Sequence, residues 1–165
     1  MLAIGIDPGT AITGYGVLRE EPDGSLSVID YGVIETSPNE AMPQRLVQLY
    51  QKLKNVIDLH KPQSGAVEKL FFARNVRTAL SVGQARGVAL LALAEAGVEL
   101  SEYSPNEVKQ AVTGYGGADK HQVQSMVQAL LGLDRIPQPD DAADALAVAI
   151  CHLHSARIQS LSDEL

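Results

Sequence analysis

The spacing of apolar residues near the start of the chain predicts a group of strands. Residues Leu2–Asp7 form a short apolar run that ends in Asp7-Pro8-Gly9-Thr10, which is typical of a buried strand followed by a turn. Extended segments are predicted over Thr13–Arg19 and Ser25–Glu35, and Glu21-Pro22-Asp23-Gly24 between them is a hairpin connection. The chain therefore opens with three antiparallel strands.

Helical spacing and strand-like runs alternate over the rest of the chain. Ser37-Pro38-Asn39-Glu40 resembles a capping box, so the first helix is predicted to begin there and to stop near His60-Lys61-Pro62. A second capping box, Ser104-Pro105-Asn106-Glu107, opens a short helix. The other predicted elements are a strand over Gly65–Leu70, a helix over Arg74–Ala96, a strand over Val98–Tyr103, and helices near Asp119–Leu131 and Asp141–His154.

These elements predict a single α/β domain over residues 1–155. Its five-stranded mixed sheet has three antiparallel strands followed by parallel ones, because strand-helix-strand units make parallel crossovers, and helices flank the sheet. The first and fourth strands are expected near the middle. Residues 156–165 are expected to form a flexible C-terminal tail.

Composition narrows the class of protein. The 165 residues are 45% hydrophobic, which excludes disordered and fibrous proteins, and no apolar run is long enough for a membrane span. A single cysteine, Cys151, cannot form an intrachain disulfide, and no basic leader precedes Asp7, so we expect a cytoplasmic protein. The net charge of -7 argues mildly against nucleic acid. However, Lys61–Ala94 holds five Lys and Arg against one acid, Glu68.

Four carboxylates are the candidate chemistry. Asp7 ends the first strand, Glu68 lies in the fourth, and Asp141 and Asp144 share one face of the last helix at a spacing of i, i+3. If the two strands are parallel neighbours, their acid-bearing ends meet at one edge of the sheet. Carboxylates gathered in this way suit a hard divalent cation, and such ions hydrolyse phosphodiesters.

Each of these acids also has a purely structural interpretation. Asp7 fits a turn, Glu68 could pair with a neighbouring Lys or Arg at the surface, and Asp140 or Asp141 could cap a helix. Asp144 lies beyond the cap and precedes nine uncharged residues, so it is harder to explain structurally. The sequence contains no closed zinc site. His152 and His154 are expected to be surface residues because they point to different sides of a helix.

A nucleic-acid surface is indicated around the basic segment. Phe71 and Phe72 precede Arg74, and an aromatic side chain in a basic loop can stack on an unpaired base, although either could pack in the core. Glycines 114, 116 and 117 before Lys120 are typical of a phosphate-contacting loop, which Lys109 could also reach. Gly83 and Gly87, one helical turn apart, allow close backbone approach to the sheet or to a second subunit.

The chain resembles the RuvC family of Holliday junction endonucleases, within the ribonuclease H-like superfamily. Several motifs in a specific order carry this resemblance over most of the chain: Gly5-Ile6-Asp7-Pro8-Gly9, Thr13-Gly14-Tyr15-Gly16, Glu68-x-x-Phe71, Gly83-Gln84-Ala85-Arg86-Gly87, Val108-Lys109-Gln110, Val112-Thr113-Gly114, Lys120 with Gln122-Val123, and Asp141-Ala142-Ala143-Asp144-Ala145-Leu146-Ala147.

The resemblance implies a ribonuclease H-like fold and a homodimer that uses Mg²⁺ or Mn²⁺, with two ions per site, to nick two same-polarity strands of a four-way junction. It places this activity in bacterial recombination and repair, downstream of the branch-migration proteins RuvA and RuvB. Some relatives carry His at the position of Asp141, so its role as ligand or water-activating base stays open. By position, Asp7, Glu68, Asp141 and Asp144 match the metal-binding tetrad, and Phe71, Lys109 and Lys120 match DNA contacts. Arg74, in the basic stretch after Phe71, is a further candidate DNA contact.

Two other functions compete with this interpretation. Asp-x-Gly-Thr after a strand also occurs in ATP-binding proteins of the actin and sugar-kinase type, but these need two lobes, and this chain has the length of one. A junction-binding module without catalysis is the other alternative. The intact set of four acids disfavours it.

Overall fold

The computed structural model describes residues 1–70 and 75–163 of the chain. Phe71, Phe72 and Arg74, which the sequence selected as DNA contacts or core residues, lie outside the described residues. Along the described chain, the elements are β1 (Leu2–Asp7), β2 (Ile12–Glu20), β3 (Leu26–Glu35), α1 (Met42–His60), β4 (Ser64–Glu68), α2 (Val76–Glu95), β5 (Glu99–Tyr103), α3 (Pro105–Thr113), α4 (Lys120–Leu130) and α5 (Asp140–Asp163).

The strands form one mixed sheet in the order β3-β2-β1-β4-β5. β1 pairs antiparallel with β2 and parallel with β4, and β4 pairs parallel with β5. This arrangement confirms the predicted fold class, with the first and fourth strands side by side at the centre. It also brings the C-terminal ends of β1 and β4 to the same edge of the sheet.

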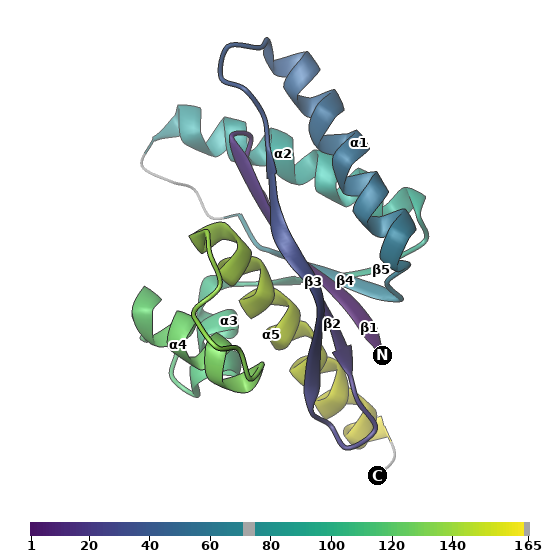
Figure 1. Ribbon diagram of the computed structural model, residues 1–165, viewed down its shortest axis with the longest axis vertical. Helices are drawn as coiled ribbons and strands as arrows, with labels where there is room; N and C mark the ends of the chain where they lie inside the picture. Colours follow the sequence, from purple (N-terminus) through teal and green to yellow (C-terminus); the bar gives the residue numbers. More distant parts are fainter. Residues whose placement is uncertain (71–74, 164–165) are drawn as a thin grey trace.

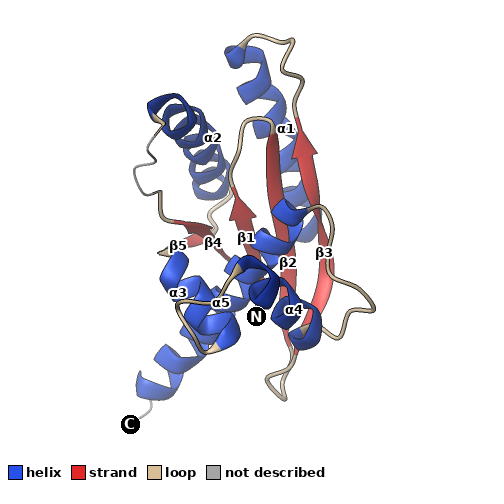
Figure 2. Ribbon diagram, turned by 90° about the vertical axis from the view of Figure 1, so that its left-hand side faces the viewer, coloured by secondary structure: helices blue, strands red, loops and turns tan. Residues whose placement is uncertain are grey.

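Helices cover both faces of this sheet (Figures 1 and 2). Side chains alternate along β1, so Ile4 and Ile6 pack with α1 and α2, whereas Ala3 belongs to the cluster formed with α3, α4 and α5. The sheet therefore separates two hydrophobic clusters. We call the face covered by α5 the α5 face.

Glycines let α5 lie directly on the sheet. A Cβ atom at Gly5 would collide with the carbonyl of Ala145, and one at Gly14 would collide with the carbonyl of Asp141. A Cβ at Gly16 would meet the side chain of Leu146. Because these positions carry no side chain, the helix backbone rests against β1 and β2, and the sheet fixes its N-terminal end.

Two predicted helix boundaries were wrong. The first helix begins at Met42, with Pro43 in its first turn, and Ser37–Glu40 forms a separate turn in which the Glu40 amide donates to the Ser37 carbonyl at 3.2 Å. A helix that began at Pro38 would hold Pro43 in its interior, where its ring clashes and its missing N–H costs a hydrogen bond. The last helix continues past His154 to Asp163, so the expected tail is helical there.

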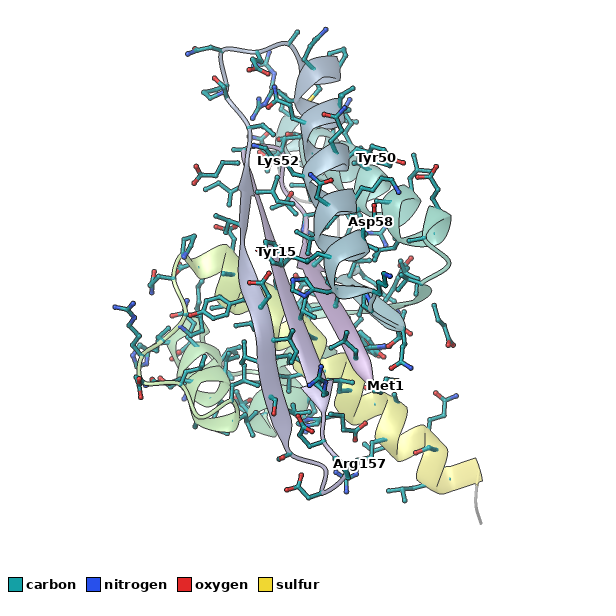
Figure 3. The ribbon with its side chains drawn as sticks, turned by 45° about the vertical axis from the view of Figure 1, so that its right-hand side comes forward. Met1, Tyr15, Tyr50, Lys52, Asp58 and Arg157 are labelled. Carbon is teal, nitrogen blue, oxygen red and sulfur yellow. The ribbon has the colours of Figure 1, made fainter. Side chains whose placement is uncertain are left out.

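The extension of α5 has a contact that sequence reasoning missed. The guanidinium of Arg157 lies 4.0 Å from the carboxylate of Glu20 and beside Gly24 in the β2–β3 hairpin (Figure 3). Residues 155–165 contain no Gly or Pro, so no backbone signal ends the helix earlier.

His152 was also predicted wrongly, as a surface residue. Its side chain is buried, and its Nδ1 lies 3.1 Å from the hydroxyl of Tyr103. The uncharged stretch around it is buried on several sides because α5 packs between the sheet and α3. No helix in the described ranges is long and apolar enough to span a membrane.

Candidate active site

Asp7 and Glu68 stand at the ends of neighbouring parallel strands. The register pairs Ile6 with Val67, so the next residues along the two strands, Asp7 and Glu68, lie side by side. Because side chains alternate along a strand, Asp7 points to the same side of the sheet as Ala3, and Glu68 to the same side as Ala66. Ala3 and Ala66 pack in the hydrophobic cluster on the α5 face. Strand pairing therefore aims both carboxylates towards the start of α5, as the sequence predicted.

The first turns of α5 complete the cluster. Asp7 pairs with Gly14 across β1 and β2, and the carbonyl of Asp141 lies directly over Gly14. Asp144 follows one turn later on the same helix. The bare backbone of Gly14 thus brings the two helix acids over the ends of β1 and β4.

The pKa values show that the four carboxylates act on one another. Burial, the largest cause, and then the negative charges of Asp144, Asp141 and Glu68 together raise the pKa of Asp7 from its ordinary 3.8 to about 7. Burial also raises the pKa values of Glu68 and Asp144. The negative charge of the cluster is thus not fully neutralised, which is typical of a site that binds a cation or acts on a phosphate.

Two lysines lie beside the cluster. The Lys120 ammonium is 3.6 Å from the Asp144 carboxylate and 3.2 Å from that of Asp140. The charge of Lys109 lowers the pKa of Glu68, against the larger effect of burial. Both lysines and the carboxylates of Glu68 and Asp144 line an open hollow of about 230 Å³, which we call the lysine hollow. The structure thus brings Lys109 and Lys120 to the candidate site.

Asp140 is a site residue that the sequence analysis treated only as a possible cap. Its carboxylate accepts a hydrogen bond from the Gln124 side chain at 3.1 Å and faces Lys120, and these contacts lower its pKa. Asp119 caps α4 through a capping box with Gln122, which places Lys120 in the first turn of that helix. Only the adjacency of Asp140 to Asp141 could have signalled its role.

The donor set fits a hard divalent cation. All four side chains offer carboxylate oxygens, the ligands that Mg²⁺ and Mn²⁺ prefer, and their mutual repulsion raises the pKa of Asp7. Within the described ranges, no three His, Cys, Asp or Glu side chains lie in an arrangement that could hold a metal ion without rearrangement. The residues therefore fit the cation by chemistry, and binding requires the carboxylates to approach one another.

The pKa of Asp7 predicts an unusual pH dependence of stability in EDTA. The folded protein keeps the Asp7 proton up to about pH 7, whereas the unfolded chain releases it near 3.8, so this group destabilises the fold as pH rises. We expect the difference in unfolding free energy between Asp7→Asn and wild type to grow by about 2 kcal/mol, in favour of Asp7→Asn, from pH 5 to pH 8. Urea unfolding of both proteins measures this difference and cancels the opposing titration of His152, whose pKa is lowered. A constant difference across that range would contradict the prediction.

Comparisons with known proteins bear on the fold and the family of this chain. The model of a family described as crossover junction endodeoxyribonuclease RuvC matches residues 3–152. A protein of that name from Chloroflexus aggregans is 58% identical over 156 residues, which cover 94% of both chains. The structure of T. thermophilus RuvC in complex with Holliday junction substrate superposes with a TM-score of 0.91 at 38% identity, covering 96% of both chains. The yeast mitochondrial resolvase Ydc2, at 14% identity and a TM-score of 0.67, shares the fold.

Proposed function

Because this chain belongs to the RuvC family of crossover junction endodeoxyribonucleases, we propose that it cuts four-way DNA junctions at the carboxylate cluster on the α5 face. The reaction is hydrolysis of phosphodiester bonds in two strands of the same polarity. The observation that carries this proposal is the raised pKa of Asp7 beside an open hollow that presents two lysines. Partly buried acids that repel one another next to cationic side chains suit a metal-assisted reaction on a phosphate.

Each residue of the cluster has a role in this proposal. Asp7, Glu68 and Asp144 would hold two Mg²⁺ or Mn²⁺ ions, and Asp141 would be a further ligand or the base that activates water. Such ions would supply Lewis-acid chemistry for hydrolysis of the phosphodiester. Lys109 and Lys120 offset the negative charge of the phosphate from the lysine hollow.

The outer surface of α2 supports a homodimer. Val76, Leu80 and Leu91 are 70%, 63% and 60% exposed, and their helical spacing puts them on one side with Gly83 and Gly87. A Cβ at Gly87 would contact nothing within 4 Å, so a second helix could approach closely there. A two-fold axis through this strip gives two active sites related like the two cut strands of a junction.

Leu80→Glu tests the dimer. A charge at the centre of the strip should remain hydrated, so we expect a monomer that makes single nicks slowly and loses paired cutting. Sedimentation equilibrium measures the mass, with Leu59→Glu, at another exposed leucine on α1, as the matched control. If the Leu80→Glu protein were still a dimer, the subunit interface would lie elsewhere on the molecule.

Junction cleavage itself is tested with a labelled mobile four-way junction in Mg²⁺ or EDTA, beside a linear duplex of the same sequence. The proposal requires paired, symmetric, ligatable nicks that depend on the metal and spare the duplex. Equal cutting of both DNAs, or binding without cuts, would reject it. In the cell, this activity would follow branch migration by RuvA and RuvB in recombination and repair. Phe71 remains a candidate contact at the junction centre, and Arg74 remains a candidate DNA contact.

A further inference from the structure

A second hollow adjoins the carboxylate cluster at Asp141, and no residue of the described chain lines both it and the lysine hollow. Its volume is about 460 Å³, and three elements line it: the β1–β2 loop with Thr10, the first turns of α2 with Arg77, Thr78 and Ser81, and the start of α5 with Asp141. We call it the arginine hollow. The lysine hollow contacts Glu68 and Asp144, so the two hollows adjoin different members of the cluster.

The wall of the arginine hollow is built from internal hydrogen bonds. The Thr10 hydroxyl, on a buried side chain, contacts the hydroxyl of Ser81 and joins the β1–β2 loop to α2, which lie close together in Figure 1. The Thr10 carbonyl accepts a hydrogen bond from the Thr36 hydroxyl, which in turn accepts from Arg45 Nε at 2.9 Å. The hydroxyl groups are therefore held in place before any ligand arrives.

Hydrogen-bond donors remain available in this hollow. Each hydroxyl has one proton, so the contact between Thr10 and Ser81 uses one and leaves the other to donate outward. Arg77 is exposed, and within the described part of the chain its guanidinium has no carboxylate at ion-pair distance. Asn75 accepts from the Arg77 amide at 3.0 Å and fixes the backbone there.

Arginine with neighbouring hydroxyl donors is a common arrangement for phosphate groups of nucleic acids. The carboxylate of Asp141 in the same wall repels an isolated anion. A phosphate that belongs to a strand already held at the cluster does not need to overcome this repulsion alone. The ligand class that fits is therefore a phosphodiester of the bound strand.

We infer that the arginine hollow holds a phosphodiester next to the scissile one, so that the cut strand crosses the cluster between Lys109 and Lys120 on one side and Arg77 on the other. Arg77 and Ser81 are positioning residues here, because they touch the strand and leave the reacting atoms to the carboxylates. This inference rests on the proposed function and adds a second anchor point for its substrate.

Arg77→Ala tests the inference through affinity and its salt dependence. Binding of the labelled junction is measured in Ca²⁺ from 50 to 300 mM KCl, and single-turnover cleavage is measured in Mg²⁺. We expect about tenfold weaker binding and a slope of log K against log salt that is smaller by about one per subunit. Arg77→Lys should recover part of the slope. Ser81→Ala should weaken binding about threefold without changing the slope, because serine carries no charge.

Lys54→Ala is the matched control. It removes the same charge from the exposed surface of α1, where Lys54 pairs with Asp58 at 3.4 Å, and should leave affinity and slope at wild-type values. Equal affinity and slope for Arg77→Ala and wild type would overturn the inference while wild-type cleavage keeps the proposed function. A reduced cleavage rate at saturation with unchanged affinity would also overturn it. A wild-type protein that does not bind the junction would overturn both.

Discussion

Asp7→Asn is expected to reduce junction cleavage by about a thousandfold or more while the protein stays folded. The amide matches the carboxylate in size, but it removes one of the four negative charges that would hold the cation. Loss of one shared ligand removes several kcal/mol of transition-state stabilisation, which corresponds to this factor. Single-turnover cleavage of the junction in Mg²⁺, at saturating protein, measures it.

Asp58→Asn is the control for this experiment. Asp58 is exposed on α1, where it pairs with Lys54, and its replacement removes the same charge far from the α5 face. Cleavage by Asp58→Asn should match wild type, and junction binding by Asp7→Asn in Ca²⁺ should persist. If Asp7→Asn cut at a rate near that of wild type, the carboxylate cluster would not be the active site.

Gly14→Val should produce the largest loss of stability. Its Cβ would collide with the carbonyl of Asp141, a backbone atom that can move only if α5 leaves the sheet. We expect a loss of about 3 kcal/mol or more, or roughly 10 °C in Tm, from overpacking at this contact. Differential scanning calorimetry measures the change, and cleavage should fall because Asp141 and Asp144 shift away from Asp7.

Gly116→Ala is the matched control for the glycine experiment. A Cβ there would meet its neighbours at 3.7 Å, an ordinary contact, so Tm should change by only about 1 °C. Gly14→Val with a wild-type Tm would mean that α5 is held elsewhere and that close backbone contact does not set the position of its acids.

Local patterns predicted the parts of this molecule that depend on neighbouring residues. The apolar run before Asp7 and the turn after it predicted β1, and the sequence Ser104–Glu107 predicted the capping box that opens α3. The parity of Asp7 and Glu68 on parallel strands was sufficient to bring these two acids together. The i, i+3 spacing of Asp141 and Asp144 added the helix.

Contacts between distant segments could not be predicted in this way. The contact between Thr10 and Ser81 joins residues 71 positions apart, and Arg157 reaches the β2–β3 hairpin from the last helix. Asp140 resembled a cap because nothing in the local sequence shows that Gln124 and Lys120 face it. The start of α1 was missed because two prolines, Pro38 and Pro43, offered competing first turns, and only one could lie inside a helix.

The central sheet also has a consequence for how such a protein can evolve. One hydrophobic cluster lies between the sheet and α1 and α2, and the other lies under α5, so the two faces of the sheet pack separate sets of side chains. The outer face of α2 and the acids of α5 belong to different layers. Lineages can therefore alter how subunits associate and how the phosphate is cut along separate mutational paths, which meet where the β1–β2 loop reaches α2 and where Arg86 of α2 donates to the Glu68 carbonyl.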